Sequence, residues 1–316
     1  MNMRVVVTGA DGFIGRVLTT RLRQRGRDVV PVTRATLAQC DGSGAVDLAD
    51  FTQWRGLLQG AGAVVHLAAR AHVVSDAARD PLAEFRRANV AGTERLLEAA
   101  VDCGVPRFLF VSSIGVLGND SGAGAFTASD LARPVEPYAR SKWEAEQRVA
   151  ALTAGTATHA VIVRPPLVYG PGVKGNFLRL LRLVHSGLPL PFAGLDSARS
   201  FVGVENLCGL LVTCIEHPAA AGRTLLVADG EDVTLPGLLA AIGRGLGHPA
   251  RLFRAPWGLM EALAKLAGRG GDLARLAGSL RVDDSATRQL LGWQPGVRFE
   301  EGIRAMAEWY LEARAS

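Results

Sequence analysis

The stretch VVVTGADGFIG, residues 5–15, decides the fold of this chain. An apolar strand runs into a loop in which Gly9, Gly12 and Gly15 come directly before a predicted helix. Glycines in such a loop allow a tight turn and a close approach of the backbone to a pyrophosphate, which binds at the helix N-terminus. The spacing is GxxGxxG rather than GxGxxG. Because a strand precedes the loop and a helix follows it, we predict a nucleotide-binding site here.

Strands and helices alternate through the first half of the chain. The predicted strands span residues 4–8, 28–33, 63–67, 107–112 and 160–164. The predicted helices span residues 13–25, 81–103 and 138–154. This alternation is typical of a parallel sheet that is covered by helices on both faces. We therefore predict an α/β fold with a doubly wound parallel sheet.

The composition changes after residue 164, where segments rich in Pro and Gly connect short elements. We expect residues 1–170 to form a nucleotide-binding domain and residues 171–316 mainly a smaller, substrate-binding lobe. The chain should return to the first domain at 204–228 through a helix and a short strand. Near the C-terminus, DDSATRQLLGWQP predicts a capped helix followed by a turn.

The bulk properties exclude several classes of protein. The chain has 316 residues, of which 48% are apolar and 21% charged, as in ordinary soluble globular proteins. The net charge is +5, but no run of five basic residues occurs, so we expect no nucleic-acid partner. A site that binds phosphates explains part of the excess.

The sequence predicts a cytoplasmic protein without a membrane span. No run of eighteen apolar residues occurs, and the N-terminus leads directly into a strand rather than a targeting segment. Residues 255–268 predict an amphipathic helix, with attachment to a membrane surface as the alternative. Four scattered cysteines lack metal-type spacing, so we expect reduced thiols and no metal site.

Two further segments, FVSSIGVLG (110–118) and YARSK (138–142), indicate chemistry. Tyr138 and Lys142 are four residues apart and lie on one face of the predicted helix. A nearby ammonium favours the phenolate, so we expect the pKa of Tyr138 to fall toward neutral. Ser113 follows an apolar strand and can reach the same space. This set predicts proton transfer to or from an alcohol or sugar oxygen while a hydride moves.

The end of the second predicted strand distinguishes between the two nicotinamide cofactors. Thr33 and Arg34 stand where an acidic residue would accept the ribose hydroxyls of NAD. A guanidinium can bind a 2′-phosphate, so the pattern favours NADP(H), with NAD(H) still possible. Alternatively, Arg34 stacks on adenine or is solvated. Asp47 and Leu48 are placed for the adenine edge.

Eight motifs occur in the order that is typical of one superfamily. They are TGADGFIG (8–15), DLAD (47–50), VVHLAA (64–69), NVAGT (89–93), FVSSIGVLG (110–118), YARSK (138–142), RPPLVYGPG (164–172) and GNF (175–177). Together they resemble the extended short-chain dehydrogenase/reductases, in particular the nucleotide-sugar epimerases, dehydratases and reductases. The resemblance covers nearly the whole chain and implies a Rossmann-type sheet with a smaller C-terminal substrate lobe.

The resemblance also implies roles for individual residues. Tyr138 would be the acid/base, Lys142 would bind the nicotinamide ribose, and Ser113 would bond the reacting sugar oxygen. Pro165 and the Tyr169 region would line the nicotinamide end. The residues expected to bind the cofactor, from the motifs and the resemblance together, are Gly9, Gly12, Phe13, Ile14, Gly15, Thr33, Arg34, Asp47, Leu48, Leu67, Ala68, Ala69, Asn89, Val111, Tyr138, Lys142 and Pro165.

The substrate side is implied by the same comparison. Asn176 and Arg199 match positions that hold a substrate diphosphate, a role that suits the forked guanidinium of arginine. Phe192 would contact the nucleobase of the substrate, or it is a plain core aromatic. Members of the superfamily often dimerise through helices equivalent to 82–103 and 138–154, so we expect a homodimer.

The type of reaction follows from departures from the pattern. Dehydratases of this kind carry an Asp–Glu pair where this chain has Ile114 and Gly115, so we do not expect 4,6-dehydration. Reduction of a 4-keto sugar and C4 epimerisation remain. The Thr33–Arg34 pair fits NADPH and a reductase, and the local sequence looks most like bacterial O-antigen enzymes that reduce UDP-4-keto-6-deoxy-N-acetylglucosamine to UDP-N-acetylquinovosamine. The alternatives are an NAD-dependent 4-epimerase of UDP-hexoses or UDP-N-acetylhexosamines, and a non-catalytic NADP-binding regulator.

Overall fold

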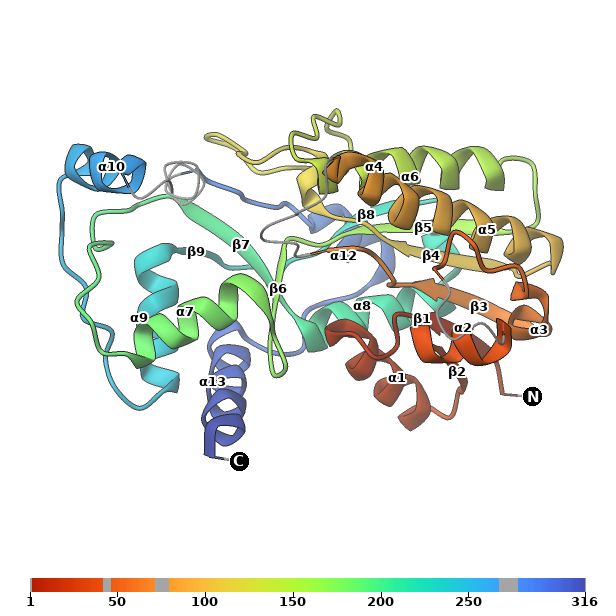
Figure 1. Cartoon of the computed structure of the whole chain (residues 1–316), viewed down its shortest axis with the longest axis horizontal. Coiled ribbons are helices and arrows are strands. Elements are labelled where there is room, and N and C mark those ends of the chain that lie inside the picture. The colour runs from red at the N-terminus through yellow and green to blue at the C-terminus, as the bar shows by residue number, and fades with distance from the viewer. Residues whose placement is uncertain (1, 42–46, 72–79, 267–277, 316) are drawn as a thin grey trace.

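A six-stranded parallel sheet forms the centre of the larger half of the molecule (Figure 1). The computed structural model describes residues 2–41, 47–71, 80–266 and 278–315. The strand order is β2-β1-β3-β4-β5-β8. These strands are β1 (Arg4–Thr8), β2 (Asp28–Val32), β3 (Ala61–His66), β4 (Arg107–Val111), β5 (His159–Arg164) and β8 (Thr224–Leu226).

Helices cover both faces of this sheet, which confirms the predicted α/β fold. One face carries α1 (Phe13–Gln24) and α8 (Val204–Glu216). The other carries α3 (Trp54–Leu58), α5 (Gly92–Asp102) and α6 (Pro137–Thr153). Side chains alternate along a strand, so Val5 and Val7 pack under α1 and α8 while Val6 packs under α5. Both cores exclude water from an apolar sheet, which is the main force that stabilises this half.

The predicted helix at 81–103 is present as three consecutive helical segments. They are α4 (Pro81–Arg86), a π-helical turn η1 (Arg87–Ala91) and α5. Asp80 caps the start, because its side chain accepts a hydrogen bond of 3.1 Å from the backbone N–H of Ala83. Single π-helical turns are frequent at functional sites.

The strand order reverses at β1. β2 lies on one side of β1 and β3 lies on the other, and all three strands run parallel. In doubly wound sheets, ligands bind beyond the carboxyl ends of the strands at such a reversal. The loops that follow β1 and β3 therefore mark the ligand-binding edge of this sheet.

A smaller group of elements surrounds a second sheet. Its strands are β6 (Leu167–Tyr169), β7 (Ala198–Gly203) and β9 (Asp232–Thr234), with β6 parallel and β9 antiparallel to β7. The helices around it are α7 (Gly175–His185), α9 (Leu235–Gly245), α10 (Trp257–Leu266) and α13 (Phe299–Ala315), on the left of Figure 1. Leu181, Ile242 and Met306 belong to its separate core.

The chain crosses between the two groups more than once. After β7 it enters α8 and β8 of the large sheet, with the short helix η3 (Pro218–Ala220) between them, and it then returns to β9. Farther along, α12 (Ser285–Leu291) follows and ends at Gly292, which has a φ of 59°. The assignment of cofactor to one group and substrate to the other stays a prediction.

A buried polar cluster joins the two groups at Asp229. The Tyr169 hydroxyl donates to its carboxylate at 2.7 Å, and the backbone N–H of Gly203 and the side-chain amide of Asn206 donate to it as well. Burial raises the pKa of Asp229, and the three donors act in the opposite direction. Tyr169 itself is fully buried, so its side chain belongs to this junction. That the Tyr169 region lines the nicotinamide end stays a prediction.

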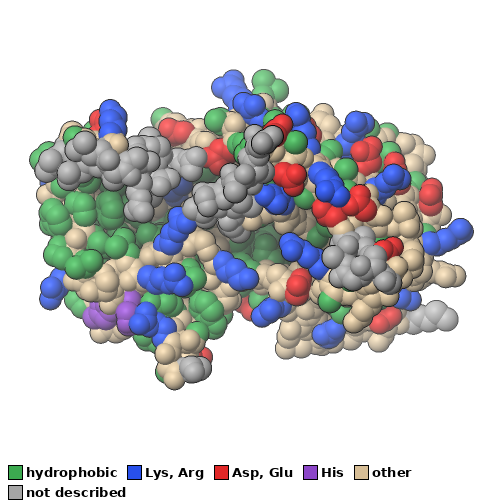
Figure 2. Space-filling model, viewed as in Figure 1, with side chains coloured by type: hydrophobic (Ala, Val, Ile, Leu, Met, Phe, Trp, Pro, Cys, Tyr) green, Lys and Arg blue, Asp and Glu red, His purple; other side chains and the backbone are tan. Residues whose placement is uncertain are grey.

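The surface carries dispersed charge. In Figure 2, Lys and Arg side chains are interspersed with Asp and Glu over the helices of the large sheet. Among the described residues, no helix is long and apolar enough to cross a membrane. The predicted helix at 255–268 corresponds to α10, and residues 267 and 268 lie outside the described part. All four cysteines are free, with Cys208 and Cys214 buried and Cys40 exposed.

Candidate active site

The glycine loop after β1 has the geometry of a dinucleotide cradle. Gly9 has a φ of 67°, and a Cβ there would lie 2.9 Å from the backbone nitrogen of Ala68. A Cβ on Gly15 would collide with the Gly9 carbonyl oxygen. Gly12 is the N-cap of α1 and offers no side chain, so the first N–H groups of that helix remain available to a phosphate. These residues fit a nicotinamide dinucleotide.

The loop after β3 lies beside this cradle. The backbone N–H of Ala68 donates to the Thr8 hydroxyl at 3.3 Å, which joins the ends of β1 and β3. Leu67 and Ala69 flank Ala68 at the same edge. The structure thus brings the predicted residues of the two loops together, and their contact with a cofactor stays a prediction.

The end of β2 carries no carboxylate. The Thr33 hydroxyl accepts a hydrogen bond of 3.1 Å from the backbone N–H of Thr36, so Thr33 caps α2 (Arg34–Asp41). Arg34 begins that helix and is exposed, and its guanidinium makes no hydrogen bond or ion pair with another described residue. Ala10 in the glycine loop donates to the carbonyl of Val32, which places the end of β2 beside the cradle.

The residues predicted for the adenine edge, Asp47 and Leu48, lie in the segment between α2 and α3. Asp47 is exposed, and its carboxylate accepts a hydrogen bond of 2.8 Å from the backbone N–H of Leu48. Leu48 packs against the helical segment at Gly92, where an added Cβ would lie 2.9 Å from the Leu48 Cβ. Their contact with adenine stays a prediction.

Helix α6 places Tyr138 and Lys142 one turn apart. Lys142 is 2% exposed, and its Nζ donates to the carbonyl of Val111 at 2.8 Å. The ammonium also lies 4.4 Å from the centroid of the Phe110 ring. Tyr138 is half-buried, with its ring edge-to-face against Phe85 at 6.0 Å. The Lys142 side chain therefore crosses from α6 to the carboxyl end of β4.

The expected fall in the pKa of Tyr138 is not found. Burial raises the pKa of Tyr138 to about 12 and lowers the pKa of Lys142 to about 7. The reason is that both groups are removed from water, and the Lys142 Nζ is directed to a backbone carbonyl. With these shifts Tyr138 is the protonated partner at neutral pH.

Ser113 occupies the turn that follows β4. Its hydroxyl accepts a hydrogen bond of 3.1 Å from the backbone N–H of Gly115 and caps the short helix η2 (Ile114–Val116). Ile114 is buried in an apolar cluster with Leu117 and Leu226, and its backbone N–H donates to the carbonyl of Pro165 at 2.9 Å. Neither Ile114 nor Gly115 can transfer a proton, so the positions of the dehydratase acids hold none.

Asn89 connects the π-helical turn to the helix of Tyr138. It is 1% exposed, and its amide donates to the hydroxyl of Ser141 at 3.0 Å. Ser141 in turn donates to the backbone carbonyl of Tyr138 at 2.8 Å. The side-chain amide oxygen Oδ1 of Asn89 accepts a hydrogen bond from the backbone N–H of Arg70. Asn89 therefore fixes the turn that carries Tyr138. Its predicted contact with the cofactor stays a prediction.

His66 is a core residue within a polar chain. Its Nδ1 lies 2.7 Å from the Thr8 hydroxyl and its Nε2 lies 2.9 Å from the Thr93 hydroxyl. Thr93 donates to the carbonyl of Asn89, so Nε2 must carry the proton that Thr93 accepts. Burial lowers the pKa of His66 to about 3, and the charge of Lys142 acts in the same direction. A neutral histidine whose two ring nitrogens are both engaged in hydrogen bonds has no free proton for catalysis.

The predicted substrate residues come from the smaller group of elements. Asn176 is exposed near the start of α7, and Arg199 on β7 is half-buried and donates to the carbonyl of Gly278 at 3.1 Å. Burial lowers the pKa of Arg199, and Asp120 opposes this. Phe192 is half-buried and packs against the second core, which fits its alternative reading as a core aromatic. Their roles in binding substrate stay predictions.

Comparison with known proteins decides the family. Residues 5–228 match the family described as "NAD dependent epimerase/dehydratase family". This chain belongs to that family. The resemblance found in the sequence is thereby confirmed at the level of the family, while the reductase subgroup is not.

Individual relatives extend over the whole chain. A UDP-glucose 4-epimerase of Vibrio cholerae is 38% identical over 99% of this chain and 97% of its own length. The structure of MoeE5 in complex with UDP-glucuronic acid and NAD is 28% identical, with a TM-score of 0.77, over 98% of this chain and 99% of that chain. The structure of DesIV, a dTDP-glucose 4,6-dehydratase from Streptomyces venezuelae with NAD, is 26% identical, with a TM-score of 0.77, over 99% and 98%.

Sequence reasoning missed one feature near this site. It is a buried ion pair that lies one helical turn beyond Lys142 on α6. Glu146 on α6 accepts two hydrogen bonds from Arg164, at 3.0 Å and 2.6 Å. The two side chains are 2% and 6% exposed. The signal was present, because Glu146 follows Lys142 by four residues and so shares its face of the helix.

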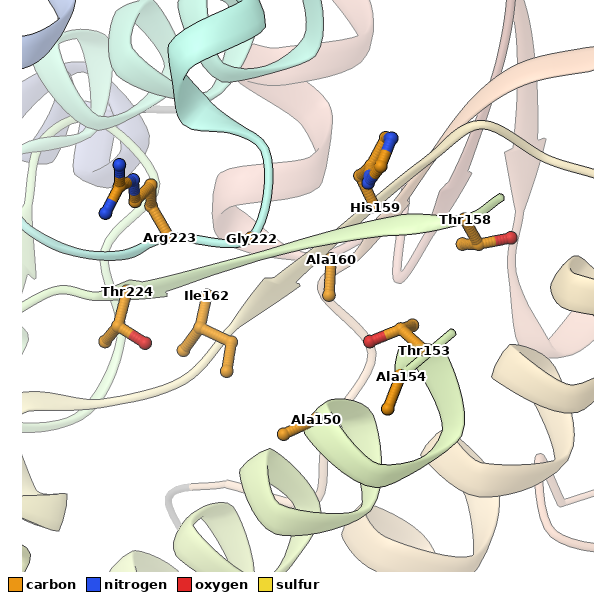
Figure 3. Close-up of a pocket in the computed structure, with 10 residues that line it drawn as sticks. All are labelled: Ala150, Thr153, Ala154, Thr158, His159, Ala160, Ile162, Gly222, Arg223 and Thr224. Atoms are coloured by element: carbon orange, nitrogen blue, oxygen red, sulfur yellow. The ribbon is translucent and has the colours of Figure 1, made fainter. Parts of the chain in front are cut away.

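A surface pocket lies at the opposite end of the sheet (Figure 3). It has a volume of about 300 Å³ and is lined by residues that include Ala150 and Thr153 of α6, His159 at the start of β5, and Arg223 and Thr224 before and in β8. These are the amino ends of the strands, whereas the glycine loop, Ser113 and Pro165 follow the carboxyl ends. The pocket is therefore separate from the candidate active site.

Proposed function

We propose that this protein is an NADP(H)-dependent reductase of the C4 keto group of a UDP-linked 6-deoxy-hexosamine. The observation that carries the proposal is the environment of Tyr138. Tyr138 is half-buried one helical turn from Lys142, and burial raises the pKa of Tyr138 to about 12. Reduction of a ketone requires a protonated acid near the carbonyl oxygen, and a phenol with a high pKa is protonated at neutral pH.

The residues of the chain then divide the work. When bound, a reduced nicotinamide supplies the hydride that the carbonyl carbon accepts. Tyr138 donates its proton to the oxygen, which becomes the C4 hydroxyl, and Ser113 holds that oxygen with a hydrogen bond. Lys142 would bond the nicotinamide ribose and stabilise the phenolate left on Tyr138. Gly9, Gly12 and Gly15 would hold the pyrophosphate.

Two features of the sequence support reduction over the other reactions of the family. Ile114 and Gly115 offer no acid for elimination of water. Arg34, exposed at the end of β2, can pair with a 2′-phosphate. A reductase releases its cofactor in each turnover, and NADPH suits that cycle. The solved relatives MoeE5 and DesIV hold NAD, so the choice of NADP(H) rests on Arg34 alone.

A second candidate is a UDP-sugar 4-epimerase that works with NAD. The relative from Vibrio cholerae, 38% identical over nearly the whole chain, is named as a UDP-glucose 4-epimerase, which favours this candidate. The same Tyr138, Lys142 and Ser113 would serve, with Tyr138 first accepting the proton of the C4 hydroxyl. A single site can therefore support either reaction, and the substrate offered decides between them.

The experiment follows nicotinamide absorbance with purified protein and freshly made UDP-4-keto-6-deoxy-N-acetylglucosamine, with NADPH and NADH in parallel. Stoichiometric loss of NADPH with formation of a UDP-6-deoxy sugar is the expected result. A parallel tube holds UDP-glucose or UDP-N-acetylglucosamine without added cofactor. Interconversion at C4 in that tube, with no loss of NADPH in the first, would replace the reductase with the epimerase.

We also propose a cytoplasmic homodimer. The helices predicted to meet at the dimer interface, α4 to α5 and α6, pack side by side on one face of the large sheet (Figure 1). Light scattering of the purified protein would give twice the 33.3 kDa mass of the chain. A mass equal to that of one chain would contradict the proposed homodimer.

A further inference from the structure

Among the described residues, Glu146 is the carboxylate whose charge favours the ionised form of Lys142, and it lies one helical turn further along α6. Glu146 follows Lys142 by four residues, and both side chains are buried. Both carboxylate oxygens of Glu146 accept hydrogen bonds from Arg164, the last residue of β5. The pair is bidentate, which fixes the plane of the carboxylate as well as its distance.

The other groups around Lys142 cannot supply a negative charge. From β4 it receives only the carbonyl of Val111 and the ring of Phe110. His66 on β3 is neutral because its pKa is lowered to about 3. Tyr138 on α6 is protonated at neutral pH. Among the described residues, Glu146 is thus the carboxylate that favours the charged form of Lys142, against burial, which lowers the pKa of Lys142 to about 7.

We infer that Glu146, held ionised by Arg164, is a positioning residue that keeps Lys142 protonated through the pH range in which Tyr138 transfers its proton. This inference rests on the proposed function, because it gives Lys142 the task of supporting Tyr138. Arg164 is needed because an unpaired buried carboxylate takes up a proton instead of staying charged. It also leads directly into Pro165, so the same pair ties the wall of the site to α6.

The test measures Lys142 directly. The chain has three lysines, Lys142, Lys174 and Lys265, and the last two are exposed. Protein with carbon-13-labelled lysine therefore gives three side-chain NMR signals, and a Lys142→Arg variant assigns the first. We expect Glu146→Gln to move the titration of Lys142 to lower pH by about one unit or more, because an opposing charge at such distances shifts a pKa by roughly one to three units.

Three further variants test the direction of the shift in the Lys142 titration and provide a control for it. Arg164→Met leaves Glu146 without its partner, so the buried carboxylate takes up a proton and Lys142 should titrate at lower pH than in wild type, as in E146Q. The double variant E146Q/R164M leaves no unpaired buried charge and also lacks the carboxylate, so Lys142 should titrate at lower pH than in wild type, and this variant replaces E146Q if E146Q alone does not fold. Glu144→Gln makes the same chemical change on the exposed side of α6 and should leave Lys142 unchanged.

Kinetics complete the test. The alkaline limb of the reductase pH profile should move to lower pH in E146Q, in parallel with the NMR titration, and stay in place in E144Q. A Lys142 titration that is the same in E146Q and E144Q would overturn the inference, whatever the activity. A shifted titration with an unmoved kinetic limb would also overturn it, because Lys142 would then not support Tyr138. The NMR titration needs no substrate, so failure of the proposed function is seen separately, as loss of turnover in wild type.

Discussion

Two of the ion pairs that helix α6 makes have the same chemistry in opposite environments. Glu146 pairs with Arg164 at 2.6 Å, with both side chains buried, and Glu144 pairs with Arg86 at 2.7 Å on the surface. The Coulomb attraction across the buried pair is screened far less by water and salt. The difference shows that distance alone does not rank these contacts. Burial decides which charges can influence Lys142, and the active site lies on the buried side.

The exposed pair still affects its own groups. Its hydrogen bond and charge raise the pKa of Arg86 and lower the pKa of Glu144. Exposed pairs of this kind contribute little to stability, because solvent screens them and two long side chains lose freedom. We therefore expect changes on the buried face of α6 to alter function and stability. Matched changes on the exposed face should leave both nearly unchanged.

Tyr138→Phe is the change on the buried face with the largest expected effect. Loss of the proton donor should lower kcat by about 10²- to 10⁴-fold, the usual contribution of a general acid, and leave cofactor binding intact. Steady-state rates and a fluorescence titration with NADPH check both parts. Tyr310→Phe, which removes the hydroxyl of a buried tyrosine on α13, is the control. Full turnover in Y138F would remove Tyr138 from catalysis.

Breaking the buried pair should be the largest effect on stability. Either Glu146→Gln or Arg164→Met leaves an unpaired buried charge, which costs about 3–5 kcal/mol in the free energy of unfolding. Glu144→Gln should change this free energy very little. Urea denaturation of the three variants gives the comparison. Equal losses in E146Q and E144Q would show that burial does not separate the two pairs.

His66 extends the comparison to pH. Burial lowers the pKa of His66 in the folded state to about 3, from an ordinary value of 6.5, so the unfolded chain binds more protons between these values. The sign follows directly: His66 contributes stability above pH 6.5, which is lost as the pH falls toward 3. The slope contributed is at most about 1.4 kcal/mol per pH unit.

A His66→Gln variant keeps donors and acceptors but does not titrate. Its free energy of unfolding should depend less on pH across this range than that of wild type. His159→Gln replaces an exposed histidine and should keep the wild-type slope. If both variants behave alike, the burial of His66 has no part in the acid sensitivity of the fold.

Arg34 tests whether an exposed charge can matter once a ligand covers it. Arg34→Ser should lower the preference for NADPH over NADH by about tenfold, because one charge-assisted hydrogen bond to a phosphate is worth roughly 1.5–3 kcal/mol. Arg55→Ser, which replaces an exposed arginine on α3, is the matched control. An unchanged ratio of kcat/KM values in R34S would leave NAD(H) as the cofactor.

Much of the larger half could be predicted from the sequence, for physical reasons. The alternation of apolar strands and amphipathic helices, together with Gly9 and Gly15, left few other folds open. The helix that carries Tyr138 and Lys142 was also predicted, because their spacing needs only local geometry. The smaller group was predicted only as a lobe, because Pro- and Gly-rich segments give no periodic signal, and β7 pairs with β9 across some thirty residues of chain.

The electrostatics of the site could not be predicted. The sequence places Lys142 near Tyr138, but the direction of each pKa shift depends on how far both groups are buried, which is a property of packing. For the same reason the partner of Glu146 was not evident, since Arg164 is distant in sequence and reaches α6 only after β5 enters the sheet. Ile114 was predicted to be inert, and its burial in a core cluster gives the structural reason.

The most direct measurement of the central claim is the fate of the hydride. The protein is supplied with NADPH that carries deuterium at the transferable position, together with UDP-4-keto-6-deoxy-N-acetylglucosamine, and the product is examined by NMR. The account predicts one deuterium at C4 of the sugar in each product molecule, and formation of this product about 10²- to 10⁴-fold more slowly with Y138F. Turnover that leaves C4 free of deuterium would contradict reduction at C4, and with it the role given to Tyr138.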